Sequence, residues 1–290
     1  MKNLQNRSRT MLLTSVFIFG TIGILRRYIP LSSSLIALVR GVIGSFFLIS
    51  LICFSKKKVN ISAIRKNLLL LIFSGAAIGF NWILLFEAYN YTSVATATLC
   101  YYLAPILVIF ASPLVLKESL TKRKLLCAVT ALLGMVLVSG ILDADFSGIA
   151  EMQGILFGLG AAALYASVIL MNKKMSGIAA YDKTILQLSM ASIALLPYVL
   201  LTADWTAVSF SPLSVTLLLI AGIVHTGIAY WLYFGSMEHL PSHTVALLSY
   251  LDPILAIVLS MVFLRDPMST AAAVGAVMIL GAAYVSEKQK

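Results

Sequence analysis

Charged residues are scarce in this chain of 290 residues: Asp, Glu, Lys and Arg make up 11% of it, against roughly 25% in an average soluble domain. Hydrophobic residues make up 60%, and the mean hydropathy is +0.99. The polar segments between the apolar runs are all short, which excludes an attached soluble domain for a nucleotide or a metal. The composition therefore predicts an integral membrane protein whose function resides within its membrane-embedded helices.

Cysteine is also scarce, and Cys53, Cys100 and Cys127 all lie within or beside apolar runs. Their odd number and their placement indicate neither a disulfide framework nor a metal cluster, so we expect small buried side chains. His239 and His243 have the spacing of two metal ligands, but the proline between them disfavours a continuous helical turn. We therefore predict no metal site and no cofactor.

Ten apolar runs can be drawn along the sequence, each about 17 to 25 residues long, the length that crosses a hydrocarbon core of about 30 Å. Charged clusters such as Lys56 to Lys58 and Lys122 to Lys124 interrupt the apolar pattern. The predicted fold is an all-α integral membrane protein with ten transmembrane helices. They are expected at residues 10–28, 34–54, 67–88, 93–116, 122–141, 152–172, 181–202, 213–236, 242–264 and 269–286.

The 21 Lys and Arg residues exceed the 11 Asp and Glu residues, but their distribution follows membrane topology rather than a nucleic-acid surface. With the N-terminus in the cytoplasm, 17 of the 21 lie in cytoplasmic loops and tails, and Arg26, Arg27 and Arg265 lie on the other side. The remaining one, Arg40, lies within the second helix. This positive-inside pattern predicts a cytoplasmic (inner) membrane protein with both termini in the cytoplasm and no nucleic-acid partner.

A long internal repeat divides the chain into two halves. The stretch Tyr102-Leu-Ala-Pro-Ile-Leu-Val-Ile returns 148 residues later as Tyr250-Leu-Asp-Pro-Ile-Leu-Ala-Ile. Without gaps, residues 79–134 and 227–282 are identical at 16 of 56 positions. We therefore predict two five-helix repeats, residues 10–141 and 152–286. Because five is an odd number, the second repeat enters the membrane from the opposite side.

The loop that follows the repeated stretch supports this inversion. Residues 117–124 contain four basic residues, of which three are absent from the corresponding residues 265–272. Thr121 and its counterpart Ser269 are retained as candidate N-caps of the next helix. Inverted repeats are typical of carriers that work by alternating access, so transport is the leading functional class.

The Tyr-x-x-Pro-Ile-Leu motifs, each preceded by Ala/Ser-x-x-Ala/Thr and followed by Leu-Lys-Glu-Ser-Leu-Thr or its counterpart, resemble the EamA family of the drug/metabolite transporter superfamily. The resemblance covers residues 10–286, and residues 86–105 match the family well. It implies ten helices, a central cavity between the halves, and transport of small metabolites such as amino acids, driven by an ion gradient or by exchange. The halves differ where Asp252 replaces Ala104.

Pro105 and Pro253 occupy matching positions inside two predicted helices. Each removes a backbone hydrogen bond and bends the helix axis. Matching breaks in inverted halves indicate a hinge or binding site near the membrane midplane, although proline is also commoner in membrane helices than in soluble ones. We interpret both prolines as hinge residues.

Four ionisable residues stand out as candidates within the predicted helices, where a charge costs at least about 2.5 kcal/mol. Arg40 is interpreted as binding a substrate carboxylate or pairing with an acid; the alternative is a buried or snorkelling arginine. Glu87 is a candidate for a coupling proton or a cationic substrate, or else a hydrated gate residue. Asp252 is a candidate proton carrier or a cap of the half-helix after Pro253. His225 is a candidate for proton exchange or a hydrogen-bonded packing residue.

Tyr102 and Tyr250 each precede a proline by three residues and so share a helix face with the break. Together they could close around an organic ligand by stacking, cation–π contact and hydrogen bonding; the alternative is helix packing, which is the default for single aromatic residues. The other predicted substrate-binding residues are Asn81, Trp82, Tyr101, Tyr165 and Trp231.

The sequence thus predicts a secondary transporter that moves a small polar or amphipathic metabolite, amino-acid-like or amine-like, across the cytoplasmic membrane by alternating access. Proton coupling is a hypothesis that rests on Glu87, Asp252 and His225. The expected partners of the protein are the small-molecule substrate, the lipid bilayer and, if transport is coupled to protons, protons. The alternatives are a channel and an intramembrane enzyme that uses Asp252 and His225 on a lipid-linked substrate. Oligomeric state, substrate identity and direction of transport are not indicated.

Overall fold

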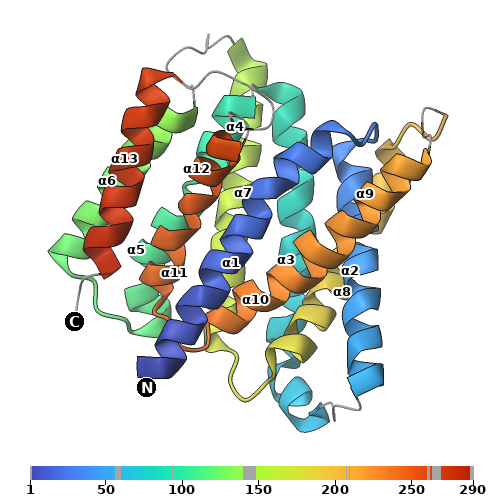
Figure 1. Ribbon diagram of the computed structural model, residues 1–290, viewed down its shortest axis with the longest axis horizontal. Helices are drawn as coiled ribbons and strands as arrows, with labels where there is room; N and C mark the ends of the chain where they lie inside the picture. The colour runs from blue at the N-terminus through green and yellow to red at the C-terminus, as the bar shows by residue number, and fades with distance from the viewer. Residues whose placement is uncertain are drawn as a thin grey trace. The chain divides into compact units, whose positions relative to one another are not determined.

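The computed structural model describes residues 2–55, 60–92, 94–139, 148–206, 208, 210–259, 262 and 269–287. The regular elements in these ranges are helices, and the ranges contain no strand (Figure 1). Six helices among them are long and apolar enough to cross a membrane. The elements are α1 Lys2–Arg27, α2 Ser33–Ser55, α3 Ile61–Tyr91, α4 Val94–Tyr101, α5 Ala104–Leu116, α6 Lys122–Ser139, α7 Gly148–Lys174, α8 Ala180–Thr202, α9 Pro212–Gly222, the π-helical turn η2 Ile223–Ile228, α10 Ala229–Ser236, α11 Ser242–Ser249, α12 Leu251–Leu259 and α13 Thr270–Glu287.

The duplication of the sequence is also a duplication of helix boundaries. Residues 94–101 and 122–139 form α4 and α6, and the residues 148 positions later form α11 and α13. The predicted N-caps are confirmed at both copies: the Thr121 hydroxyl accepts from the Lys124 N–H at 3.3 Å, and the Ser269 hydroxyl accepts from the Ala272 N–H at 3.1 Å. The same local signals therefore start the same helix twice.

Several helices extend beyond the apolar runs that predict them. α1 begins at Lys2 rather than near residue 10, and α3 begins at Ile61 rather than near residue 67. Arg7, Arg9 and Arg65 therefore lie in helices rather than in a tail or a loop. The reason is that hydropathy marks only the part that crosses hydrocarbon, whereas helix geometry continues into the polar interface.

The chain packs as two compact units. Unit 1 comprises Met1–Ile83 and Met171–His239, and unit 2 comprises Leu84–Leu170 and Leu240–Lys290. Each unit thus combines helices from both sequence halves. Within unit 1, α2 packs against its counterpart α8; within unit 2, α6 packs side by side with its counterpart α13 (Figure 1). Contacts between counterparts are those expected near a two-fold axis.

Glycine permits close helix packing within both units. Gly75 and Gly79 on α3 face α8, and a Cβ added at Gly75 would lie 2.5 Å from a neighbouring side-chain atom. Gly154 and Gly158 on α7 face α4 and the residues before it, where a Cβ added at Gly154 would lie 2.6 Å from a side-chain atom of Thr92. Both pairs have the GxxxG spacing that is typical of close contacts between membrane helices.

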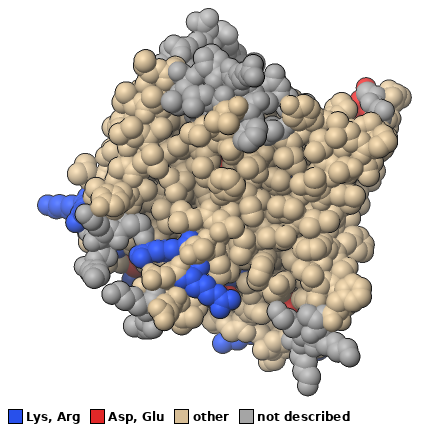
Figure 2. All heavy atoms as spheres, in the orientation of Figure 1, with Lys and Arg blue, Asp and Glu red and all other residues tan. Residues whose placement is uncertain are grey.

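The outward surfaces of the helices are apolar. The side chains of Phe46 and Leu114 are 67% and 87% exposed, whereas the polar residues Asn81 and Gln187 are 1% and 0% exposed. On the face drawn in Figure 2, the described atoms along the helices are almost all tan, and blue or red atoms are few. An apolar exterior over buried polar groups is the arrangement that a hydrocarbon surrounding favours.

Candidate functional site

Two helices of unit 2 are broken at repeat-equivalent positions. α4 ends at Tyr101 and α5 begins at Ala104 with Pro105 in its first turn, while α11 ends at Ser249 and α12 begins at Leu251. Proline has no N–H to donate to the carbonyl four residues before it, so it fits best in the first turn of a helix, where that N–H would have no partner within the helix. Both prolines therefore lie in the first turn of a new helical segment rather than at a bend in one continuous helix.

Tyr102 and Tyr250 lie at these two breaks and contact each other. Their ring centroids are 6.3 Å apart with an interplanar angle of 30°. The Tyr250 hydroxyl donates to the Tyr102 carbonyl at 2.8 Å, and the Tyr102 hydroxyl donates to Oδ2 of Asp252 at 3.0 Å. The structure thus joins three of the predicted site residues into one hydrogen-bonded group, the Tyr102–Tyr250–Asp252 cluster.

The cluster is asymmetric although the tyrosines are counterparts. Asp252 provides a carboxylate for Tyr102, whereas the counterpart of Asp252 is Ala104, which offers Tyr250 no such acceptor. Asp252 lies in the first turn of α12, where the helix dipole favours a negative charge. Its Oδ2 atom, however, accepts from a phenol of the other half, an interaction that a simple helix cap would not require.

Two further predicted aromatic residues lie beside this cluster. The rings of Tyr101 and Tyr165 stack with centroids 5.5 Å apart, and Tyr101 meets Tyr102 edge-on at 5.9 Å. Unit 2 therefore contains a continuous row of four aromatic rings, and one of its inner members, Tyr102, donates to the Asp252 carboxylate. Glu87 near the end of α3 is half-buried, and its Oε2 accepts from the Asn90 side chain at 3.3 Å.

Unit 1 contains the other predicted residues. The Arg40 guanidinium lies 5.0 Å from the ring centroid of Trp82, a cation–π contact, and Trp82 meets its own counterpart Tyr230 edge-on at 6.3 Å. The Arg40 Nε atom is buried, with no hydrogen-bond partner in the described part of the chain. Asn81, next to Trp82, is 1% exposed. Arg40 thus lies against an aromatic face.

His225 lies in the π-helical turn η2 and is 4% exposed. Its Nε2 atom is 2.8 Å from the Thr21 hydroxyl, and its Nδ1 atom is 3.4 Å from the Ile220 carbonyl. Both ring nitrogens therefore have partners within unit 1, which favours the packing interpretation. A π-helical turn is nonetheless frequent at functional sites.

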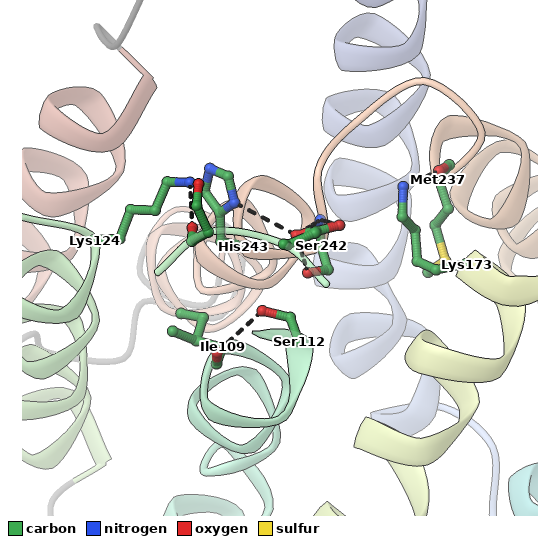
Figure 3. A network of polar contacts seen from close by, with 9 residues as sticks. Ile109, Ser112, Lys124, Lys173, Met237, Ser242 and His243 are labelled. Carbon is green, nitrogen blue, oxygen red and sulfur yellow. Dashed lines mark hydrogen bonds and ion pairs between the residues drawn. The ribbon is translucent and has the colours of Figure 1, made fainter. Parts of the chain in front are cut away.

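One candidate residue that the sequence patterns did not single out is Lys183. Lys183 lies in the first turns of α8, is 1% exposed, and directs its Nζ to the Phe234 carbonyl at 3.5 Å. The Lys173 Nζ donates to the Met237 carbonyl at 2.9 Å (Figure 3). Both ammonium groups lie at the C-terminal end of α10, where the last carbonyls need donors and the helix dipole favours cations. The available signal was that Lys183 falls inside the apolar run.

A second missed residue is Glu118, within the Leu-Lys-Glu-Ser-Leu-Thr motif. Its carboxylate accepts from the Ser242 hydroxyl at 2.6 Å and from the Ser242 N–H at 3.1 Å, at the first residue of α11 (Figure 3). The His243 Nδ1 atom is 3.8 Å from the same carboxylate. Glu118 therefore binds the N-terminus of a broken helix of the other repeat.

Trp231 lies on α10 and contacts Tyr181 on α8. Its ring stacks on Tyr181 with centroids 4.6 Å apart and lines a pocket of about 800 Å³ within unit 1. These contacts lie within unit 1, and the role of Trp231 in substrate binding stays a prediction.

Two segments of the chain, residues 8–140 and 152–287, match the family described as EamA-like transporter family. The chain belongs to this family. The resemblance drawn from the Tyr-x-x-Pro-Ile-Leu motifs is thereby confirmed, and so is the general assignment as a multi-pass membrane protein of a transporter family.

Known proteins are similar to this chain over most of their length. The uncharacterized transporter YxxF of Bacillus subtilis (strain 168) is 31% identical over 252 residues, which cover 86% of this chain and 79% of that protein. Protein PecM of Dickeya dadantii (strain 3937) is 28% identical over 72% of this chain and 69% of its own. A solved crystal structure superposes with a TM-score of 0.83 over 96% of each chain at 19% identity, which establishes the shared fold.

Proposed function

We propose that the protein is a secondary transporter that moves a small polar or amphipathic metabolite, amino-acid-like or amine-like, across the cytoplasmic membrane by alternating access. Ten transmembrane helices form two inverted repeats, residues 10–141 and 152–286, with both termini in the cytoplasm. The observation that carries this proposal is the pair of matching helix breaks joined by Tyr102, Tyr250 and Asp252. Family membership supports transport as the general activity.

The Tyr102–Tyr250–Asp252 cluster has the groups that an amine-bearing substrate needs. The Asp252 carboxylate attracts a substrate ammonium or accepts a hydrogen bond, and the tyrosine rings contact its carbon skeleton. A substrate that binds Asp252 replaces the Tyr102 hydroxyl and so loosens the contact between the two breaks. Pro105 and Pro253 let each half-helix reorient about its break. Exchange between the two inverted repeats then exposes the site to either side in turn.

Other candidate residues have subsidiary roles in this proposal. Arg40, held on the face of Trp82, is a binding group for a substrate carboxylate. Asp252, Glu87 and His225 are the candidates for proton coupling.

The test is counterflow of labelled amino acids and amines in liposomes that contain the purified protein. A carrier gives saturable uptake that unlabelled substrate inside the liposomes accelerates. The double variant Tyr102→Ala, Tyr250→Ala should lose at least about tenfold in apparent affinity, because two ring faces are removed. Tyr284→Ala, at a 61% exposed tyrosine of the same unit, should behave as the wild type. Single-channel currents, or flux that rises with concentration without saturation, would contradict alternating access.

A further inference from the structure

A pocket of about 800 Å³ lies within unit 1, where the start of α1, the connection between α7 and α8, and the end of α10 meet. Its volume is in the range of small-molecule sites, roughly 300 to 1,000 Å³. The wall from α1 is a single helix face that includes Arg7 and Met11. The connection between α7 and α8 turns at Gly177, whose φ of 71° favours glycine.

Positive charge predominates around this pocket. Arg7 and Lys173 line it, and Glu238 is the one acid among its described lining residues. The buried Lys183 lies close enough to interact electrostatically with both Lys173 and Glu238. The excess of cations favours an anionic ligand.

An aromatic face lies in the same wall. The rings of Tyr181 and Trp231 stack with centroids 4.6 Å apart at 30°, and both side chains are half-buried and line the pocket. Each ring supports the other, which fixes a flat apolar surface at little entropic cost. A ligand with a planar or hydrocarbon part would cover this surface while its charged group meets the cations.

The second repeat does not reproduce this pocket. The counterparts of Arg7 and Lys173 at the 148-residue offset are Ile155 and Leu25, and the counterpart of Trp231 is Ile83. The tyrosine pair at the helix breaks, in contrast, is present in both halves. The charged and aromatic residues of this pocket are therefore not duplicated by the repeat.

We propose that this pocket is a second binding site, separate from the Tyr102–Tyr250–Asp252 cluster, for an organic anion. Arg7 and Lys173 hold its carboxylate or phosphate, and its apolar part lies against Trp231. Two sources share this chemistry, a soluble aromatic acid and the head group of an anionic lipid. Binding at this site does not require transport, so the proposal stands or fails independently of the proposed function.

The test is isothermal titration calorimetry on the purified full-length protein in a neutral detergent. Indole-3-acetate represents the soluble acid and short-chain phosphatidylglycerol the lipid; tryptamine and short-chain phosphatidylcholine are the probes without net negative charge. At least one anionic probe should bind, and should bind more tightly than its matched probe. Binding of indole-3-acetate identifies a metabolite site, and binding of phosphatidylglycerol alone identifies a lipid site.

Paired variants place the binding in the pocket. Arg7→Gln should weaken the binding of the anionic probe about tenfold, because a charge-assisted hydrogen bond is lost. Lys174→Gln removes the same charge beside Lys173 at an exposed position outside the pocket lining, and should change binding less than twofold. Equal melting temperatures of the two variants show that both are folded. No binding by either anionic probe, equal binding of the matched probes, or equal effects of the two substitutions would overturn the proposal.

Discussion

A single side chain distinguishes the two helix breaks. Asp252 accepts a hydrogen bond from Tyr102, and its counterpart Ala104 has no polar side-chain atom. The repeat places both tyrosines in equivalent positions, and this much can be predicted from spacing. The bond between Tyr102 and Asp252 joins residues 150 positions apart, so it depends on how the two broken helices pack and could not be derived from either stretch alone.

Asp252→Asn is the substitution that tests proton coupling at this residue. The amide oxygen still accepts from the Tyr102 hydroxyl, so the local structure should persist, but the side chain no longer exchanges a proton. We expect that an imposed pH gradient drives accumulation of substrate by the wild type and not by the variant, while counterflow without a gradient continues. Accumulation by the variant at the wild-type level would exclude Asp252 as the coupling residue.

Glu118 is the residue whose loss should most affect the start of α11. Glu118→Gln exchanges a charged acceptor for a neutral one at the Ser242 N–H and hydroxyl. We expect a loss of about 1.5 to 3 kcal/mol in the free energy of unfolding, the range for hydrogen bonds to charged groups. Denaturant unfolding in detergent measures it. The neighbouring Ser119→Ala, at an exposed side chain, is the control and should be neutral; an equal effect would argue against the cap.

At the scale of helices, apolar runs locate the elements well and their interruptions poorly. The runs predicted at residues 34–54 and 181–202 match α2 and α8 to within one residue at each end. No pattern in the sequence predicts the π-helical turn η2, which lies where α2 packs closely and Gly44 lies beside the backbone of Gly222. Tertiary packing of this kind is invisible to a periodic pattern.

Gly44→Ala tests that close approach. A Cβ at Gly44 would lie 2.9 Å from the Gly222 carbonyl oxygen and 3.0 Å from the Gly227 nitrogen, so backbone must move. We expect destabilisation of about 1 to 3 kcal/mol, as for other overpacked sites, seen as a lower melting temperature. Gly281→Ala is the matched control, since no atom lies within 4 Å of its added Cβ; it should be neutral or stabilising. Equal melting temperatures for the two variants would refute the packing argument.

At the scale of the whole molecule, the duplication could be predicted from the sequence, but the packing of the duplicated helices could not. The 148-residue offset predicts repeated helices, and α4 with α11 and α6 with α13 follow it. The compact units, however, each take helices from both halves, because a helix can bury its face against either copy of a duplicated partner. The pocket beside Trp231 could not be predicted for the same reason, since its walls come from three distant stretches of chain.

The inverted insertion of the two repeats is the central claim, and it is tested most directly by labelling one pair of equivalent positions. Thr121 and Ser269 are exposed N-caps 148 residues apart. In a variant without Cys53, Cys100 and Cys127, a single cysteine at each position is exposed to a membrane-impermeant maleimide in intact cells and in inverted vesicles. The account predicts that position 121 reacts only from the cytoplasmic side and position 269 only from the outside. Reaction of both positions from the same side would contradict it.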